Sequence, residues 1–299
     1  MDSALTSIGL PIALGIIMLG LGLSLTLQDF ARVAKHPRAV IIALACQLLL
    51  LPALAFGLVL LFQLPPVLAV GMMMLAASPG GTTANLYSHL FRGDVALNIS
   101  LTAVNSVVAV VTLPLITNVA IWYFQPFDGQ LGLQWSKTLE VFAIVLLPVI
   151  LGMLVRRFRP RFADRMDKPV RIASVIILAV VIAGAVIANW QLLIDNVAQL
   201  ALITVLFCLL SLAVGYWVPR LLRVERRQAI AASFEIGIHN ATLAIVIAQS
   251  VLGSMELSLP AAVYGVLMFF VAFAFGFALF RRADASAEPA VPVTDASAA

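Results

Sequence analysis

Long uncharged apolar runs are the feature of this sequence that most restricts its fold. A helix rises about 1.5 Å per residue, so roughly 20 apolar residues cross the hydrocarbon core of a membrane, which is about 30 Å thick. Nine such runs occur, at 8–27, 38–62, 66–91, 95–124, 136–156, 170–189, 196–219, 228–252 and 259–280. Hydrophobic residues make up 63% of the chain and charged residues only 11%, which excludes a water-soluble surface. The sequence therefore predicts an all-α polytopic membrane protein with nine transmembrane helices.

The positions of lysine and arginine indicate the orientation. Short cytoplasmic loops hold an excess of these residues. With the N-terminus outside, 17 of the 18 basic residues fall on the inner side, and only Lys137 lies outside. We therefore expect a multi-pass protein of the plasma membrane, here a bacterial inner membrane, with a disordered cytoplasmic tail at 283–299. Because the basic residues are scattered between the apolar runs, no nucleic-acid partner is expected. Nothing in the sequence indicates the oligomeric state.

Two of the predicted spans contain helix-breaking residues close to their midpoints. The span 66–91 is interrupted by Ser78-Pro79-Gly80-Gly81-Thr82. Proline lacks a backbone donor and glycine weakens a helix, so the helix should break here. The span 228–252 carries Glu235-Ile236-Gly237-Ile238-His239-Asn240 at its centre. By the predicted topology the two spans run in opposite directions, a pattern typical of secondary transporters with inverted repeats.

Glu235 is the acid that lies deepest within any predicted span. An ionised carboxylate is costly in hydrocarbon, so it should coordinate a cation, pair with a base or carry a proton. The structural alternative is a neutral glutamate that is hydrogen-bonded between helices. Helix breaks at the same depth would leave amide ends that favour an anion and carbonyl ends that favour a small cation. The pattern thus indicates a site that couples an anionic substrate to sodium or protons.

Further polar residues could complete this site. Asn98, Thr102 and Asn105 share one face of the fourth predicted helix, and Gln47 lies within the second. Polar stripes of this kind often serve only as hydrogen-bonding contacts between helices. The two interrupted spans favour the site over that alternative.

At these residues the sequence resembles the bile acid:sodium symporter family. The matching elements are Pro79-Gly80-Gly81-Thr82 with Asn85, the stretch Arg92–Leu97, Gln47, and Glu235 with Asn240. The resemblance implies an inverted repeat of five-helix units with two crossing discontinuous helices. It implies one transporter domain, 1–282, with a core bundle of the spans in 38–124 and 196–280 and a panel bundle of those in 8–27 and 136–189. Family members often have ten spans, and this chain looks as if it lacks the first.

The resemblance also implies two sodium sites and a substrate site. Carried over by position, the first sodium site uses Asn85, Asn98, Thr102 and Glu235. The second uses Gln47, Glu235 and backbone carbonyls at Ile236, Ile238 and His239. The substrate site lies near Thr82, Asn240 and Thr242.

Two departures from the family pattern matter most: the family often has serine where this chain has Ala84 and glutamine where it has His239. Neutral imidazole is a poor sodium ligand, and it titrates near pH 6.5 when unperturbed, so His239 puts the second site in question. His239 is equally compatible with a packing role between helices. Asn98, where the family commonly has serine, keeps an oxygen.

The function that these features predict is a sodium-coupled symporter of small organic anions, bile-acid-like or smaller carboxylates, that works by alternating access. The alternative is a proton-coupled transporter that uses Glu235 and His239. An intramembrane enzyme is less well supported because the sequence has no aspartate pair, no His-Glu-x-x-His pattern and no reactive cysteine neighbourhood. Because these catalytic patterns are missing, we expect no enzymatic activity. A channel or a non-transporting sensor would show a repeated pore motif or a regulatory soluble domain, and neither is found in this sequence.

Overall fold

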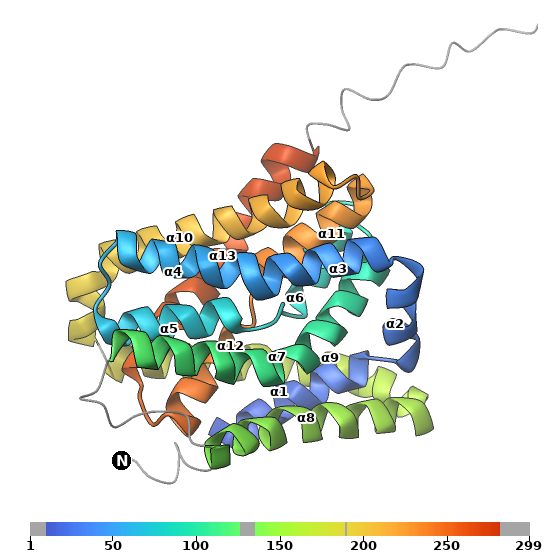
Figure 1. Cartoon of the computed structure of the whole chain (residues 1–299). Helices are drawn as coiled ribbons and strands as arrows, with labels where there is room; N and C mark the ends of the chain where they lie inside the picture. Colours follow the sequence, from blue (N-terminus) through green and yellow to red (C-terminus); the bar gives the residue numbers. More distant parts are fainter. Residues whose placement is uncertain (1–9, 126–134, 189, 282–299) are drawn as a thin grey trace, which may run out of the picture.

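The computed structural model describes residues 10–125, 135–188 and 190–281, and every regular element in these ranges is helical (Figure 1). The prediction of an all-α chain is confirmed for this part of the protein. The α-helices are α1 (Leu10–Ser24), α2 (Leu27–Arg32), α3 (Pro37–Ala45), α4 (Leu51–Leu61), α5 (Pro66–Ala77), α6 (Thr83–Leu90), α7 (Val95–Phe124), α8 (Trp135–Phe158), α9 (Pro160–Ala188), α10 (Trp190–Leu221), α11 (Arg226–Gly237), α12 (Ala241–Val246) and α13 (Leu259–Gly276). The π-helical turns Cys46–Leu50, Ile247–Val251 and Phe277–Arg281 extend or join several of them. The predicted tail at 283–299 lies outside the described residues.

Helix bounds follow the predicted apolar runs except where a helix continues into polar sequence. Helix α9 begins at Pro160 rather than at residue 170, because the basic segment before the apolar run is also helical. Helix α2 is a short element that the apolar pattern does not contain. Hydropathy detects the part of a helix that suits lipid, whereas backbone hydrogen bonding continues beyond it.

Four continuous helices in the described ranges are long and apolar enough to cross a membrane, at 37–61, 95–124, 190–221 and 256–279. A fifth is obtained if the bent pair 14–24 and 27–35 is taken as one span. The apolar helices Pro66–Ala77 and Ala241–Val251 are shorter because the chain unwinds beside them. The structure is that of a polytopic membrane protein, and the total of nine spans stays a prediction.

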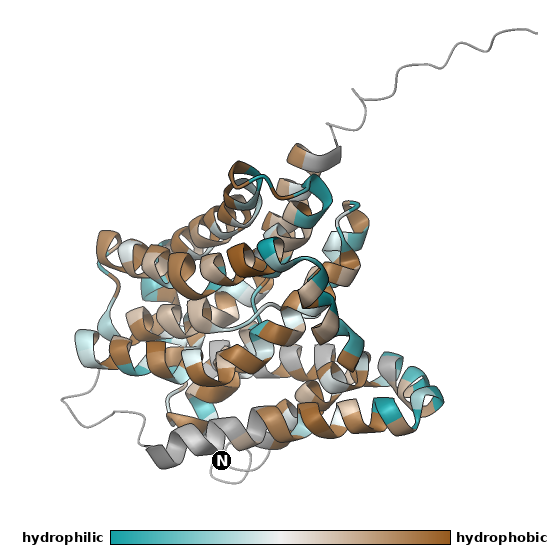
Figure 2. Cartoon of the chain, turned by 45° about the vertical axis from the view of Figure 1, so that its right-hand side comes forward, coloured by the Kyte–Doolittle hydropathy of each residue, from teal (hydrophilic) through white to brown (hydrophobic). Residues whose placement is uncertain are grey.

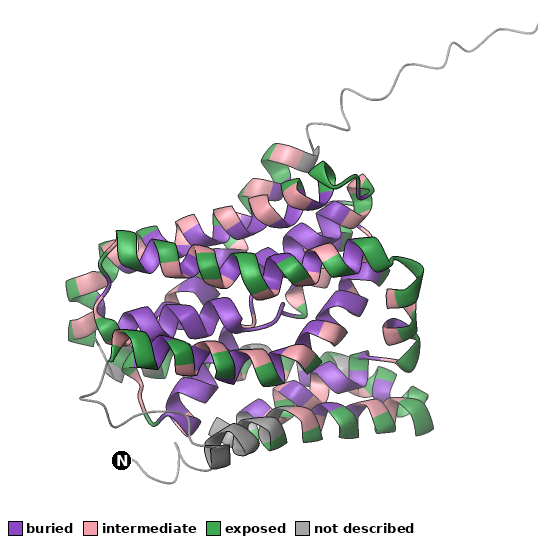
Figure 3. Ribbon diagram, viewed as in Figure 1, coloured by how far each residue is buried: buried purple, intermediate pink, exposed green. Residues whose placement is uncertain are grey.

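The helices pack in two groups. Helices α1, α8 and α9 contact one another and lie together along one side of the molecule (Figure 1). In the larger group α10 packs against α11 and α13, α5 against α4 and α7, and α11 against α6 and α7. Helices α5, α11 and α12 are almost entirely buried within it (Figure 3). Apolar residues such as Leu61, Val180 and Phe270 are exposed, as expected for contact with lipid. Hydrophobic residues cover much of the ribbon in Figure 2.

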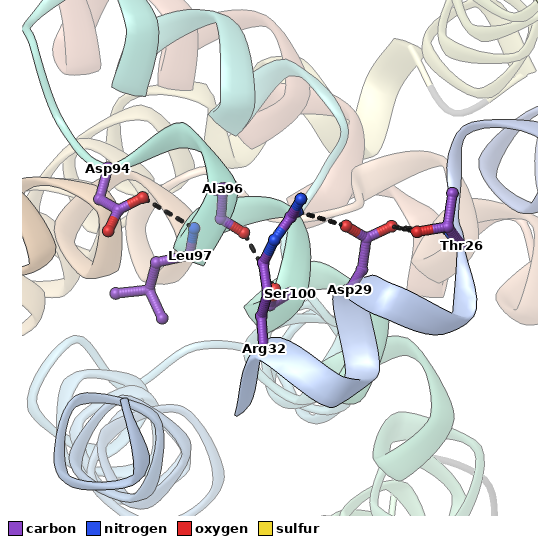
Figure 4. A network of polar contacts seen from close by, with 7 residues as sticks. All are labelled: Thr26, Asp29, Arg32, Asp94, Ala96, Leu97 and Ser100. Atoms are coloured by element: carbon purple, nitrogen blue, oxygen red, sulfur yellow. Dashed lines mark hydrogen bonds and ion pairs between the residues drawn. The ribbon is translucent and has the colours of Figure 1, made fainter. Parts of the chain in front are cut away.

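A hydrogen-bonded corner connects α1 to the larger group. The chain bends by 64° between residues 14–24 and 27–35. The buried carboxylate of Asp29 accepts hydrogen bonds of 2.7 Å from the Thr26 amide and hydroxyl and pairs with Arg32 at 2.7 Å (Figure 4). Helix α2 packs against α7, whose first turn is capped by Asp94. These contacts fix the direction in which the chain leaves α1.

Candidate cation site

Two interrupted helices meet at the centre of the larger group. Helix α5 ends at Ala77 and α6 begins at Thr83, whereas α11 ends at Gly237 and α12 begins at Ala241. The unwound segments pair with each other through an isolated antiparallel bridge between Gly80 and His239. The Gly81 amide donates to the Ile238 carbonyl and the Asn240 amide to the Pro79 carbonyl, both over 2.8 Å. Both predicted interruptions are therefore confirmed. Backbone groups that one break leaves without a helical partner form hydrogen bonds with the other break.

Glu235 lies one turn before the second break and is fully buried. Its Oε2 accepts a hydrogen bond of 2.5 Å from the Thr102 hydroxyl, and its Oε1 accepts one of 3.3 Å from Asn105 Nδ2. The Gly80 backbone also lies close to this carboxylate. A β-carbon at position 80 would overlap the Glu235 carboxylate, so the close approach requires glycine. Thr102 and Asn105 are both neutral donors, which leaves the charge of an ionised carboxylate uncompensated.

Asn98 ties three helices together next to this acid. Its Nδ2 donates to the carbonyl of Ala84 in α6 over 3.3 Å and to that of Ala231 in α11 over 3.2 Å. Carbonyl oxygens can only accept, so these contacts fix which end of the amide faces them. The Asn98 Oδ1 is consequently left buried with no hydrogen-bond partner, and so is the Asn85 Oδ1 on α6.

A second polar cluster surrounds the carbonyl of Ser78, at the end of α5. This oxygen accepts a hydrogen bond from Gln47 Nε2 over 3.0 Å and lies 3.1 Å from His239 Nδ1. The Gln47 Oε1 and the His239 Nε2 have no hydrogen-bond partner. The His239 ring stacks on Phe207 with 5.4 Å between centroids and meets the edge of Tyr264. His239 thus has both polar contacts and a packing role.

The backbone oxygens that the resemblance assigns to the second sodium site are partly engaged. The Ile238 carbonyl accepts from Gly81 and the His239 carbonyl from Ala241. The preceding carbonyl, of Gly237, accepts from the Tyr264 hydroxyl over 2.8 Å. Ile236 is fully buried in the last turn of α11. Each carbonyl oxygen has two lone pairs, so the oxygens of Ile238 and His239 keep one acceptor position.

Unpartnered amide oxygens are the most informative feature of this region. Those of Gln47, Asn85, Asn98 and Asn105 are all buried without a hydrogen bond. Buried polar atoms nearly always have partners, so a group of such exceptions calls for an explanation such as a bound ion. Carboxylate and amide oxygens are the ligands that hard cations prefer. Glu235 and the four amide oxygens together carry the single negative charge of the Glu235 carboxylate, which suits a monovalent ion.

The structure places the predicted substrate residues at the paired breaks. Thr82 is exposed and precedes α6, and Thr242 is buried in α12. Asn240 caps α12, because its Oδ1 accepts from the Leu243 amide over 3.1 Å. A concave surface of about 680 Å³ lies elsewhere, between the α6–α7 turn and the start of α11, and is lined in part by Arg92, Asp94 and Arg227. None of the predicted site residues lines it.

Asn105 contacts Glu235 in the structure. Sequence reasoning placed Asn105 on the polar helix face but assigned it to neither sodium site. Its position three residues after Thr102 was the available signal, because residues at this spacing are neighbours on a helix surface. Only the structure shows that its amide reaches Glu235.

Fold and site together define a polytopic membrane protein whose paired helix breaks surround a buried acid and oxygen-rich side chains. Residues 11–196 match the model of the Sodium Bile acid symporter family. Because this match covers more than half of the chain, the protein belongs to that family. The matched segment includes Gln47, Asn85, Asn98 and Thr102 and ends before Glu235.

Named relatives match most of the chain. It is 28% identical over 257 residues to the probable sodium/metabolite cotransporter BASS2, chloroplastic, of Oryza sativa subsp. japonica, a match that covers 86% of this chain and 60% of the rice protein. It is 27% identical to the uncharacterized sodium-dependent transporter YocS of Bacillus subtilis (strain 168), with 85% and 78% covered. It is 30% identical to the human sodium/bile acid cotransporter 4, with 91% and 60% covered. The chain thus spans about 60% of the length of the rice and human proteins.

Proposed function

We propose that the protein is a sodium-coupled secondary active symporter of a small organic anion. Family membership and the names of the relatives support sodium coupling. The observation that carries the proposal is the buried Glu235 beside amide oxygens that have no hydrogen-bond partner. In a transporter of this kind a sodium ion is a co-substrate, and these oxygens are suited to replace its hydration shell.

In the proposed first site, Asn85, Asn98, Thr102 and Glu235 bind one sodium ion. The ion neutralises the carboxylate and gives the unpartnered oxygens of Asn85 and Asn98 a partner. These residues come from α6, α7 and α11, so binding holds three helices in one arrangement. In the proposed second site, Gln47 and Glu235 act with carbonyl oxygens at Ile236, Ile238 and His239, of which the last two keep one acceptor position each.

The proposed substrate site lies at Thr82, Asn240 and Thr242. Helix N-termini present free amide groups and favour anions. The helices Thr83–Leu90 and Ala241–Val251 both begin at the paired breaks. Sodium bound on the carbonyl side of these breaks would order the amide side, so an organic carboxylate should bind more tightly when sodium is present.

The proposed architecture is an inverted repeat of nine spans with two crossing discontinuous helices in one transporter domain. Helices α1, α8 and α9 would form the panel, and the larger group would form the core that rocks against it. Helices α1, α8 and α9 contact one another more extensively than they contact the larger group, which supports this division. We further propose an external N-terminus, because that orientation puts nearly all the basic residues on the cytoplasmic side.

Uptake by the purified protein in liposomes tests the function. The experiment compares a set of radiolabelled carboxylates, including bile acids, with an inward sodium gradient and with choline in place of sodium. We expect at least one substrate to accumulate only with the sodium gradient. Uptake that is unchanged without sodium but lost when a proton gradient is collapsed would contradict sodium coupling.

A proton-coupled mechanism is the second candidate, and one observation favours it. The His239 Nε2 is buried without a partner while Nδ1 faces the Ser78 carbonyl, so the ring retains a position that could accept a proton. In this version Glu235 and His239 would carry the coupling ion. The same liposomes, given a pH gradient in place of a sodium gradient, distinguish the two mechanisms.

A further inference from the structure

Asn105 and Thr102 are two buried α7 residues whose side chains contact Glu235. The Asn105 side chain is 3% exposed. Its Nδ2 lies 3.3 Å from Glu235 Oε1, whereas the Thr102 hydroxyl contacts the other carboxylate oxygen, Oε2. The two α7 side chains therefore hold opposite ends of the same carboxylate.

The orientation of the Asn105 amide follows from this contact. A carboxylate that is ionised can only accept hydrogen bonds, so the amide nitrogen must face Glu235. The Asn105 Oδ1, on the same carboxamide, makes no hydrogen bond to Glu235 and is buried without any hydrogen-bond partner. Thr102 and Asn105 have the same capability: each donates a hydrogen to Glu235 and keeps an oxygen that can bind a cation.

We propose that Asn105 is a further ligand of the cation site, binding the ion through Oδ1 while its Nδ2 holds Glu235. This inference rests on the proposed function. It also bears on the departure at position 239, where imidazole stands in place of an amide. The His239 ring lies against the Ser78 carbonyl and Phe207. Asn105 supplies an amide oxygen beside Glu235 that the imidazole of His239 cannot supply.

Sodium-dependent thermal stability of the purified protein tests this assignment. The unfolding midpoint is measured against sodium chloride, with choline chloride holding the ionic strength constant, to give an apparent sodium affinity. A ligand that binds only the folded state raises the midpoint with its concentration. The variant Asn105→Leu keeps the size of the side chain but removes both donor and oxygen. Asn105→Ser keeps an oxygen and serves as a second variant if the leucine variant unfolds.

Thr117→Val is the matched control. Thr117 is also buried on α7 with an unpartnered oxygen, but it lies about three helical turns beyond Asn105. We expect Asn105→Leu to weaken the apparent sodium affinity about tenfold or more, which corresponds to about 1.4 kcal/mol, and Thr117→Val to leave it unchanged. Asn105→Ser should fall between Asn105→Leu and the wild type.

The response of the midpoint to sodium separates ion binding from a purely structural role. Asn105→Leu also removes the hydrogen bond to Glu235, so its midpoint in choline should fall whether or not Asn105 binds the ion. A ligand role predicts in addition a smaller rise of the midpoint with sodium. A lower midpoint in choline with an unchanged sodium affinity would show a structural role and overturn the assignment. If Asn105→Leu and Asn105→Ser both show the same rise of the midpoint with sodium as the wild type, the assignment of Asn105 as a ligand is also overturned. No sodium response in the wild type would overturn the proposed function itself and this assignment with it.

Discussion

The Thr102 hydroxyl donates to Glu235 Oε2 over 2.5 Å and so joins the middle of α7 to the last turn of α11. This is the shortest of the side-chain contacts that hold Glu235. It orients the buried acid without neutralising it, because a hydroxyl carries no net charge. In the proposed function, this orientation leaves the negative charge of the carboxylate to a sodium ion.

Glu235→Gln separates the charge of this residue from its shape. Glutamine can still accept from Thr102 but has no negative charge, so we expect sodium-driven uptake to fall to the sodium-free rate. The variant should still insert and fold, because it removes an uncompensated buried charge. Glu235→Ala should have the same transport defect. The measurement is uptake into liposomes with sodium or with choline.

Glu225→Gln is the control for this prediction. Glu225 is exposed and lies just before α11, so neutralising it should leave the sodium dependence unchanged. Wild-type sodium dependence in Glu235→Gln would remove the acid from the mechanism.

Gly80→Ala should displace the Glu235 carboxylate, which lies directly against Gly80. The added β-carbon would lie against the carboxylate and 2.7 Å from the Glu235 backbone oxygen, both of which would have to shift. Overpacking of this kind costs about 1–3 kcal/mol, and the displaced carboxylate should bind sodium more weakly. Gly57→Ala is the control, because nothing lies within 4 Å of a β-carbon there. The check is the unfolding midpoint with and without sodium, and an unchanged sodium response in Gly80→Ala would contradict the prediction.

Sequence patterns predicted the helices and the two breaks because both depend on local chemistry. Apolar runs of span length determine where a helix suits lipid, and Pro79 with its neighbouring glycines determines where a helix cannot continue. The sequence could not show that the breaks pair through Gly80 and His239, because that bridge depends on how distant helices pack. Helix α2 escaped prediction because six residues are too few to produce a periodic signal.

The site was predictable to the level of residue types but not of contacts. The depth of Glu235 and the stripe of Asn98, Thr102 and Asn105 can be read from spacing alone. Which amide faces the acid cannot be read in this way, since it depends on the positions of carbonyls such as that of Ala84. Whether the predicted ligand sets bind sodium stays a prediction.

Ala84 and Asn98, which both stand where the family often has serine, are in contact. We therefore predict that the two differences compensate for each other. Asn98 Nδ2 reaches the Ala84 carbonyl over 3.3 Å, a distance that the shorter serine common in the family would not span. Asn98→Ser alone should destabilise the protein and weaken sodium binding, because two buried carbonyls lose a donor. Ala84→Ser added to it should restore part of both, by supplying a hydroxyl on the residue whose carbonyl Asn98 contacts.

A double-mutant cycle measures this compensation. Residues in direct contact typically show coupling energies of about 0.5–3 kcal/mol, and we expect a favourable value in this range for the midpoint and for the apparent sodium affinity. Asn98→Ser combined with the distant Gly57→Ala should give effects that simply add. Additive effects for the neighbouring pair would show that the two departures are independent.

His239→Gln distinguishes the two coupling mechanisms within one variant. Glutamine could donate to the Ser78 carbonyl as the His239 ring does and would also present an amide oxygen near the paired breaks. If sodium is the coupling ion, the variant should keep sodium-driven uptake, with an apparent sodium affinity equal to or higher than that of the wild type. The exposed His89→Gln serves as the control for a general effect of losing a histidine. If protons are the coupling ion, His239→Gln should instead abolish uptake driven by a pH gradient in liposomes free of sodium, because glutamine cannot bind a proton in this range.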